Sequence, residues 1–424
     1  MLQIAQIQEK KETVIAGLKK RNFKEPEKAI DSLLELDSQR KSIQQKQDKT
    51  LAESNQLSKQ IGQLMKQGKK EESEIIKQQT AKFKAESKIL GEELKEVSEE
   101  LQQLLYTIPN IPNPIVPAGN SEEDNKVLST HGDIPELYEG AKPHWDLIEQ
   151  YDIIDFELGN KITGAGFPVY KGKGAKLQRA LVNFFLDEAS KVGYDEVQPP
   201  ILINQASGYG TGQLPDKEGQ MYHATEDDYY LIPTAEVPIT NMYRDVILKE
   251  EALPKKHVGF TPCFRREAGS WGAHVRGLNR LHQFDKVEIV QVQHPDKSYA
   301  VLDDMSNYIQ SLLKKLELPY RVLLLCAGDL GFTSAITYDM EVFSAAQQKW
   351  LEVSSVSNFE TYQANRLKLR YRDSDNKTQL LHTLNGSALA LPRIVAAILE
   401  NNQTAEGIKI PKVLVPYCGF EWIN

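Results

Sequence analysis

The stretch 263–288 combines residue types that can hold a nucleotide and a small polar substrate. Side chains two apart in a strand share a face, so Phe284, Lys286 and Glu288 point the same way. If this strand forms a hairpin with the apolar one before it, Arg265 lies beside them. An aromatic ring can stack on a base, a guanidinium fork can hold a phosphate or carboxylate, and a carboxylate can accept hydrogen bonds. From these residues alone, a solvated hairpin with ordinary cross-strand ion pairs stays open as an alternative.

The order FRRE, a Gly/Arg loop and HQFDKVE resembles motif 2 of the class II aminoacyl-tRNA synthetases, in particular their serine-specific branch. Segment 174–197, followed by Pro199 and Pro200, resembles motif 1, and TLNGSALALPR at 383–393 matches motif 3. The resemblance covers essentially the whole chain. It implies an α+β fold, with an N-terminal antiparallel α-helical coiled-coil arm and a class II synthetase catalytic domain whose mixed, mainly antiparallel β-sheet is flanked by helices.

The resemblance also implies roles for individual residues. Serine would be bound by Thr234, Ala235, Glu236, Arg265, Glu288, Asn385 and Ser387. ATP would be bound by Arg265, Arg266, Glu267, Leu281, Phe284, Glu352, Val353, Ser354, Ser355 and Arg393. Catalysis would depend on Arg265, Glu267 and Arg393.

Elementary chemistry fits several of these assignments. Glu236 and Thr234 offer a carboxylate and a hydroxyl, which suit an ammonium group. The resemblance implies that Glu352 and Ser355 bind the Mg²⁺ that accompanies ATP, the co-substrate, and their hard oxygen atoms suit that ion. Without the resemblance this segment would be interpreted as a surface turn. Arg393 falls in the first turn of a buried apolar helix, where an unpaired charge is costly, so we expect it to hold the γ-phosphate.

The implied activity is that of a serine–tRNA ligase. L-serine attacks the ATP α-phosphate to give seryl-adenylate and pyrophosphate, and the 3′-terminal adenosine of serine tRNA then takes the seryl group. Selenocysteine tRNA is a second candidate acceptor. Positioning and charge stabilisation would suffice without a protein nucleophile. A class II homologue that charges a carrier other than tRNA is one alternative, and a binding module without catalysis is another. The basic arm argues against the first, and the joint presence of costly polar site residues argues against the second.

The first hundred residues carry heptad repeats. One run has apolar or Thr side chains seven apart, at Leu36, Ile43, Thr50, Leu57 and Leu64, and a second has them at Ile76, Phe83, Leu90, Val97 and Leu104. Gly68 lies between the runs, where the chain must reverse. The pattern predicts two antiparallel helices that form an arm of roughly 60 Å.

Basic residues gather in the distal half of this predicted arm. Between positions 40 and 70 the acidic residues are Asp48 and Glu53, whereas eight are basic: Arg40, Lys41, Lys46, Lys49, Lys59, Lys66, Lys69 and Lys70. A polar heptad hairpin alone could equally serve protein interaction or dimerisation. The charge favours a phosphate backbone, and the resemblance implies that the patch meets the long variable arm of serine tRNA. Arg276 would meet the acceptor end.

The prolines and the segment boundaries give the remaining expectations about domain organisation. The prolines of 107–120 predict a linker, so we divide the chain into an arm domain (1–106), a connecting segment (107–150) and a catalytic domain (151–424). We expect His144, near the entry to the catalytic domain, to be structural rather than catalytic. Motif 1 implies a homodimer, although its pattern fits a buried helix in a monomer equally well.

The same features indicate where the protein works. The three cysteines form no ligand cluster, so neither zinc nor a disulfide is expected, and no apolar run is long enough to span a membrane. We therefore expect a soluble cytoplasmic protein without a membrane partner. The net charge of −8 means that nucleic acid must be bound by a local patch. Four positions depart from the family pattern and leave the acceptor-end contacts open: Trp271, His274, Thr337 and Asn365.

Overall fold

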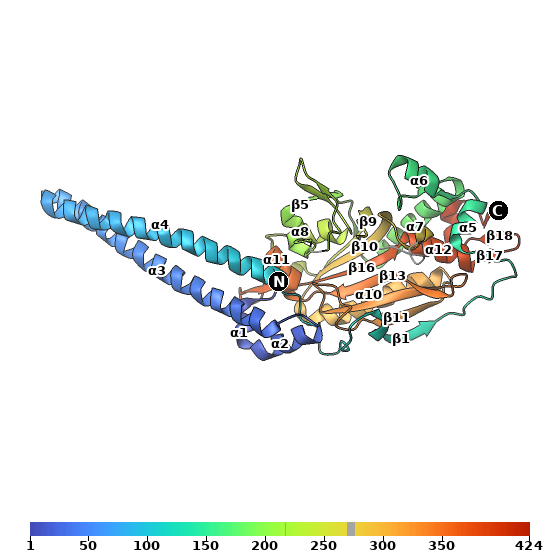
Figure 1. The fold of residues 1–424 in the computed structure, drawn as a ribbon, viewed down its shortest axis with the longest axis horizontal. Helices are drawn as coiled ribbons and strands as arrows, with labels where there is room; N and C mark the ends of the chain where they lie inside the picture. Colours follow the sequence, from blue (N-terminus) through green and yellow to red (C-terminus); the bar gives the residue numbers. More distant parts are fainter. Residues whose placement is uncertain (217, 269–275) are drawn as a thin grey trace. The chain divides into compact units, whose positions relative to one another are not determined.

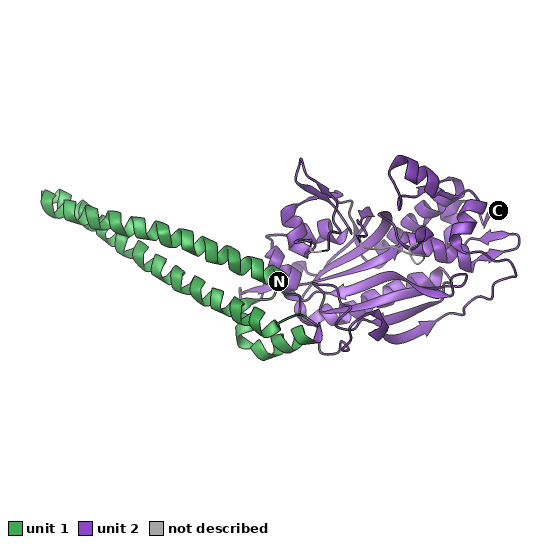
Figure 2. Ribbon diagram, in the orientation of Figure 1, with its two compact units in different colours: residues 1–19, 23–109 green, residues 20–22, 110–424 purple. Residues whose placement is uncertain are grey.

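The computed structural model describes residues 1–216, 218–268 and 276–424. The chain divides into two compact units, 1–19 with 23–109 and 20–22 with 110–424 (Figure 2). Within the described ranges, no helix is both long enough and apolar enough to cross a bilayer. Trp271 and His274 lie outside these ranges.

Unit 1 is helical. It holds the short helices α1 (Ile4–Glu9) and α2 (Lys11–Lys20) and the long helices α3 (Pro26–Lys66) and α4 (Lys70–Thr107). Proline suits the first helical position because its fixed φ matches the helix and its missing N–H is not needed there. Gly68, with φ 76°, takes the left-handed conformation of the turn between α3 and α4. The two helices run antiparallel (Figure 1), which confirms the predicted coiled-coil arm.

The seam of this arm is made of small hydroxyl residues more than of the large ones in the heptad lists. The large side chains are half-buried, and the fully buried hydroxyl residues along the arm are Thr50, Ser54, Ser73, Thr80 and Ser87. Thr50 and Thr80 donate to the carbonyls four residues earlier, at 2.9 and 2.8 Å. Small residues at the centre let α3 and α4 approach closely, and the larger ones flank the seam.

Unit 2 is built on an eight-stranded sheet (Figure 1). In spatial order its strands are β1 (Lys126–His131), β11 (Tyr320–Leu324), β12 (Ile336–Ser344), β13 (Lys349–Asn358), β16 (His382–Ala390), β10 (Gln283–Gln293), β9 (Lys255–Phe264) and β4 (Asp195–Glu196). The pairs are antiparallel except β4 with β9. This arrangement confirms the mainly antiparallel sheet of the predicted fold class.

Three helices supply apolar side chains to the core on one face of this sheet: α7 (Gly172–Lys191), α10 (Ser298–Lys315) and α12 (Leu391–Asn401). Their buried residues join Val287 and Ile289 of β10 and Leu384 of β16 in a single apolar cluster. Strand side chains alternate between faces, so Glu288, Asn385 and Ser387 point to the opposite face. That face carries the polar chemistry.

Shorter elements surround the sheet. The helices are α5 (His144–Gln150), α6 (Phe156–Ile162), α8 (Gln205–Thr211), α9 (Glu236–Asn241), α11 (Thr361–Leu367) and α13 (Val415–Cys418), and a 3-10 turn, η4, spans Gly277–Asn279. The small sheets are β2 (Ile154–Asp155) with β3 (Val169–Tyr170); β5 (Leu202–Asn204), β7 (Tyr229–Leu231) and β6 (His223–Ala224); β15 (Thr378–Leu380), β14 (Arg370–Arg372) and β8 (Ile247–Lys249); and β17 (Gln403–Thr404), β18 (Gly407–Lys409) and β19 (Trp422–Ile423).

Candidate active site

The register of the central strands brings the predicted residues together. Glu288 on β10 is opposite Ser387 on β16, and Val290 is opposite Asn385. Partners in an antiparallel pair share a face, so the three polar side chains converge on the face opposite the helical core. The preceding hairpin also forms, with Phe284 of β10 opposite Cys263 of β9.

Glu288 is the centre of a buried polar cluster. Its carboxylate has no exposed surface and lies 2.7 Å from the Nζ of Lys286, and it accepts hydrogen bonds from Asn385 Nδ2 at 3.0 Å and Ser387 Oγ at 3.2 Å. Lys286 also donates to Thr234 Oγ1 at 2.7 Å. A buried carboxylate is costly unless it is paired and hydrogen-bonded. Here an ammonium and two neutral donors meet that requirement and hold the cluster in one arrangement.

A second carboxylate, Glu236 at the start of α9, lies at the edge of this cluster. It is buried and accepts a hydrogen bond from Gln363 Nε2 at 2.7 Å, and Gln363 Oε1 accepts one from Thr383 Oγ1 at 2.7 Å. Burial raises the pKa of Glu236 to about 7, and the charge of Glu288 acts in the same direction. Glu236 can therefore gain or lose a proton near neutral pH.

A cleft of about 230 Å³ opens beside the cluster. The predicted residues that line it are Arg265, Glu267, Leu281, Phe284, Glu352, Val353, Ser354, Ser387 and Arg393. The guanidinium of Arg265 lies 5.2 Å from the centre of the Phe284 ring, a cation–π contact that sets the positive charge against the aromatic face. One cleft thus offers an aromatic surface, the guanidinium groups of Arg265, Arg280 and Arg393, and the buried polar cluster at its end.

Arg393 lines the cleft, and 31% of its side chain is exposed. It donates from Nη1 to the Glu352 carbonyl at 2.6 Å and from Nε to the Asn279 carbonyl at 3.1 Å. The first turn of α12 ends at the cleft and not in the core, and two backbone carbonyls hold the guanidinium there. At the other side Glu267 is ion-paired with Arg280.

The segment 352–355 lies within strand β13, so its interpretation as a surface turn is wrong. Ser355 donates to the half-exposed carboxylate of Glu352 at 3.3 Å, and Ser354 donates to the Ser387 carbonyl at 2.6 Å. Beside Ser355 lies Asp339 of β12, whose pKa burial raises well above its usual range, with the charge of Glu352 acting in the same direction.

These oxygen donors fit Mg²⁺. Within the described ranges no cluster of three or more His, Cys, Asp or Glu side chains could hold a metal ion by itself. Mg²⁺ commonly takes one or two protein carboxylates and keeps waters and substrate phosphates as its other ligands. Glu352 with Ser355, at the edge of the cleft, is a donor set of that kind.

The remaining predicted residues have less direct contact with the polar cluster or the cleft. Ala235 and Leu281 are buried and line the site through packing, and Arg266 is exposed, with its N–H bonded to the Gln220 carbonyl at 2.9 Å. Arg276 is exposed and packs on α5, with its guanidinium 4.8 Å from the Trp145 ring. Two positions that depart from the family pattern have ordinary surroundings. Thr337 is buried and hydrogen-bonded to Ser334 and Ser357, and Asn365 lies in α11.

The basic residues of unit 1 are not equivalent. Asp37, three residues before the predicted patch, is buried and forms ion pairs with Arg40 at 2.8 Å and Lys41 at 2.6 Å; Lys69 pairs with Glu72 at 3.2 Å. In the described ranges no ion pair within 4 Å involves the other five, which are Lys46, Lys49, Lys59, Lys66 and Lys70. The facing segment 71–88 of α4 carries four acidic and four basic residues and adds no net charge.

Sequence reasoning missed three residues of the site. Lys286 was placed on the correct strand face but received no role; its alternation with Phe284 and Glu288 was the available signal. Gln363 and Asn279 lie in segments without a chemical motif, and their importance follows from tertiary partners. No local sequence pattern predicts those contacts.

Comparison with known proteins places the geometry in context. The family model described as the seryl-tRNA synthetase N-terminal domain matches residues 1–112, and the tRNA synthetase class II core domain (G, H, P, S and T) matches residues 220–402. A serine–tRNA ligase of Salinibacter ruber is 51% identical over 397 residues, 93% of each chain, and one of Finegoldia magna is 45% identical over the full length of both.

Solved structures give the same result. Seryl-tRNA synthetase from Pyrococcus horikoshii, complexed with ATP, superposes with a TM-score of 0.91 at 34% identity, covering 100% of this chain and 99% of that one. The cytoplasmic serine–tRNA ligase of Naegleria fowleri, in complex with AMP, gives 0.86 at 26% identity with the same coverage.

The raised pKa of Glu236 predicts a specific pH dependence of stability. Between pH 4.5 and about 7 the folded chain keeps a proton on Glu236 that the unfolded chain has lost, so stability falls as pH rises through this window. Glu236→Gln should remove that slope and be more stable than the wild type above pH 7, by on the order of 3 kcal/mol. Denaturant unfolding at pH 5 to 8 measures this. Glu149→Gln, an exposed carboxylate on α5, is the control; an equal gain for Glu236→Gln at pH 5 and pH 8 would contradict the assignment.

Proposed function

The chain belongs to the seryl-tRNA synthetase family, and we infer that it is an ATP-dependent serine–tRNA ligase of class II. The observation that carries this inference is the match of both the arm and the core, over nearly the full length of the relatives. The chemistry of the cleft supports it, because a buried polar cluster lies at one end of a cleft lined by an aromatic ring and three arginines.

We propose that the buried cluster is the serine pocket. Glu288 would accept the hydrogen bond of the substrate hydroxyl, and Asn385 and Ser387 hold its carboxylate for that purpose. Glu236 and Thr234 would receive the ammonium group, and Arg265 the carboxylate. A substrate without the hydroxyl makes one hydrogen bond fewer to this buried charged acceptor, so alanine should be rejected by about 1.5–3 kcal/mol.

We assign the ATP-binding site to the cleft, from the residues that line it. Adenine would stack on Phe284 beside Leu281, Arg265 would meet the α-phosphate, and Arg393 would meet the γ-phosphate from its fixed position on α12. Arg266 and Glu267 would flank the nucleotide, and Val353 and Ser354 would form the opposite wall. Mg²⁺, when bound by Glu352 and Ser355, would supply positive charge to the phosphates.

The reaction needs no protein nucleophile in this arrangement. A serine carboxylate oxygen attacks the α-phosphorus, the bond to the bridging oxygen breaks, and pyrophosphate leaves with the electron pair. Arg265 and Arg393 stabilise the charge that develops on the phosphates. A terminal hydroxyl of tRNA then attacks the seryl carbonyl and releases AMP.

Three further assignments complete the proposal. The lysines of the arm would meet the phosphates of the long variable arm of serine tRNA, and Arg276 the acceptor end. A groove of about 460 Å³ beside α7, lined by residues such as Arg179 and Phe260, supports a homodimer formed through motif 1. We place the protein in the cytoplasm.

The first experiment is serine-dependent ATP–pyrophosphate exchange without tRNA, followed by transfer of labelled serine to total tRNA. Glu288→Gln puts an amide NH₂ against Lys286 or Asn385, so kcat/KM for serine should fall about 100-fold, as expected for a lost hydrogen bond to a charged group. Glu226→Gln, an exposed carboxylate, should leave it unchanged. Exchange without transfer would favour the carrier-charging alternative, and no exchange would refute the catalytic assignment.

A second prediction concerns the arm. Changing the five lysines without an ion pair (Lys46, Lys49, Lys59, Lys66 and Lys70) to Gln should raise KM for tRNA at least tenfold at about 0.15 M salt and make its salt dependence shallower, because fewer counterions are released. Exchange without tRNA should not change. Lys28→Gln with Lys95→Gln, in the same two helices outside the patch, is the control. An unchanged KM would instead favour a protein-interaction role for the arm.

A further inference from the structure

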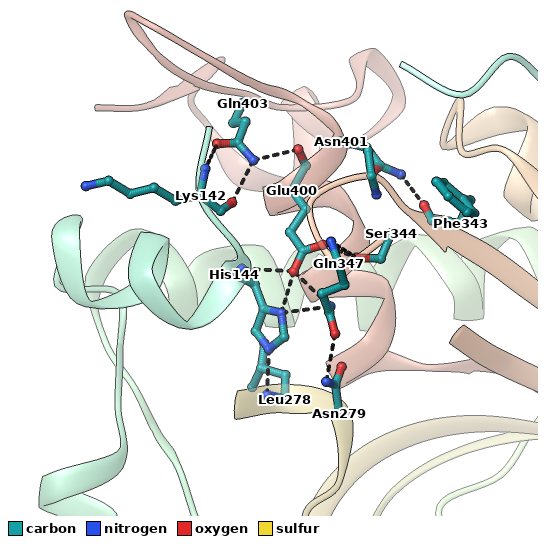
Figure 3. A network of polar contacts seen from close by, with 11 residues as sticks. Lys142, His144, Leu278, Asn279, Phe343, Ser344, Gln347, Glu400, Asn401 and Gln403 are labelled. Atoms are coloured by element: carbon teal, nitrogen blue, oxygen red, sulfur yellow. Dashed lines mark hydrogen bonds and ion pairs between the residues drawn. The ribbon is translucent and has the colours of Figure 1, made fainter. Parts of the chain in front are cut away.

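A buried histidine outside the proposed substrate contacts joins three segments that are distant in sequence (Figure 3). His144 begins α5 and has no exposed surface. Its Nδ1 lies 2.7 Å from Glu400 Oε1 in the last turn of α12, and its Nε2 lies 2.9 Å from the backbone nitrogen of Leu278 in η4. Its own N–H also donates to Glu400 at 2.9 Å. Glu400 is likewise fully buried and accepts a hydrogen bond from Ser344.

The hydrogen bonds fix the tautomer of this histidine. A backbone N–H can only donate, so Nε2 accepts from Leu278 and carries no proton. Nδ1 therefore holds the proton and donates it to the Glu400 carboxylate. The ring is a neutral connector with one donor and one acceptor. Burial would raise the pKa of Glu400, but the bonds from His144 and Ser344 lower it below its usual value, so the carboxylate stays ionised and a strong acceptor.

These hydrogen bonds form a closed network that includes Arg393. From Glu400 in α12 the network runs through His144 in α5 to Leu278 in η4. The next residue, Asn279, connects η4 back to α12, because its backbone carbonyl accepts a hydrogen bond from Arg393 Nε at 3.1 Å. Arg393 and Glu400 are seven residues apart, about two helical turns, and so lie on the same side of α12. The position of the guanidinium in the cleft depends on where η4 is held.

A second path reinforces the first. Gln347, in the turn between β12 and β13, donates to Glu400 Oε1 at 2.9 Å and accepts from Asn279 Nδ2 at 2.9 Å (Figure 3). Gln347 does not line the cleft, whereas Leu278, Asn279 and Arg280 do. Two connections, which also contact each other through Gln347 Nε2 and His144 Nδ1 at 3.3 Å, therefore fix η4 to the C-terminal end of α12.

We propose that His144 is a positioning residue for ATP. Through its Nε2 acceptor it fixes η4, and η4 holds Arg393 at the phosphate end of the cleft. The inference rests on the proposed function, since it assigns Arg393 to the triphosphate. A guanidinium held in place before binding loses less side-chain entropy when it meets the phosphates, so loosening η4 should weaken ATP more than serine.

Two substitutions of His144 separate its contact to Glu400 from its contact to Leu278. In His144→Asn the amide NH₂ replaces Nδ1 and keeps the bond to Glu400, while the acceptor for Leu278 is lost. In His144→Gln the longer amide places its oxygen where Nε2 was and keeps Leu278 bonded, while the donor to Glu400 is lost. Each variant loses one buried hydrogen bond, so both should lower the melting temperature by similar amounts.

Steady-state ATP–pyrophosphate exchange supplies the decisive comparison. His144→Asn should raise KM for ATP about tenfold, with KM for serine and kcat at saturating ATP within about twofold of the wild type. His144→Gln should keep KM for ATP within about twofold. Equal effects of the two variants on KM for ATP, or no effect of either, would overturn the proposal and leave the network a purely structural one.

A second pair keeps the test independent of activity and of the folding of the histidine variants. Gln347→Ala removes the parallel connection, and Gln348→Ala removes a neighbouring amide that donates to the Ala345 carbonyl. Calorimetric titration with a non-hydrolysable ATP analogue should show affinity several-fold weaker for the first and unchanged for the second. Equal affinities would refute the positioning role. A wild type that binds the analogue but shows no serine-dependent exchange would refute the proposed function instead.

Discussion

The ion pair between Glu288 and Lys286 is the interaction on which the site depends. Both side chains are almost fully buried, at 1% and 6% exposed. They come from one strand, two residues apart, so any sheet that forms here places them together. Their remaining donors and acceptors must come from elsewhere, which requires Thr234, Asn385 and Ser387 to approach β10. A slip of one residue between β10 and β16 would point Val287 or Ile289 at this cluster and bury the charges in the apolar core. The register of the central sheet is thus specified by polar as well as apolar burial.

The same site holds two carboxylates in different surroundings. Glu288 has an ammonium partner within 2.7 Å, whereas Glu236 has the neutral amide of Gln363. Burial without a cationic contact is why the pKa of Glu236 rises to about 7. A positively charged ligand would provide the missing partner and favour the ionised form. Of the two carboxylates, Glu236 is therefore the one that a positively charged ligand would pair with.

The local and repetitive features of this chain could be predicted from its sequence, whereas its tertiary pairings could not. The heptads and Gly68 predict the two arm helices, and strand alternation predicts that Phe284, Lys286 and Glu288 share a face. The predicted run includes the buried Thr50, but the arm also buries Ser54, Ser73, Thr80 and Ser87, which the apolar heptads do not point to. Asp37 was missed as the partner of Arg40 and Lys41 because it lies just outside the counted segment. Gln363 and Asn279 have meaning only through tertiary partners, such as Glu236 for Gln363 and Arg393 for Asn279, which no local pattern connects to them. Arg393 was placed in the first turn of a helix, but helix periodicity does not show that α12 begins at the edge of a cleft.

Helix α12 shows how one element can serve both the core and the cleft. Its sequence contains two charged residues, Arg393 and Glu400, and both lie on one side while the remaining side chains pack in the apolar core. Neither charge is paired with the other. Arg393 is held by backbone carbonyls at the cleft, and Glu400 is held by His144 and Ser344 in the interior. Because η4 contacts both ends of this polar side, through Asn279 and through His144, a shift of α12 along its axis would break bonds at both ends together. The apolar core fixes the depth of the helix, and the polar side fixes its position along the axis, which is the coordinate that decides how far Arg393 reaches into the cleft.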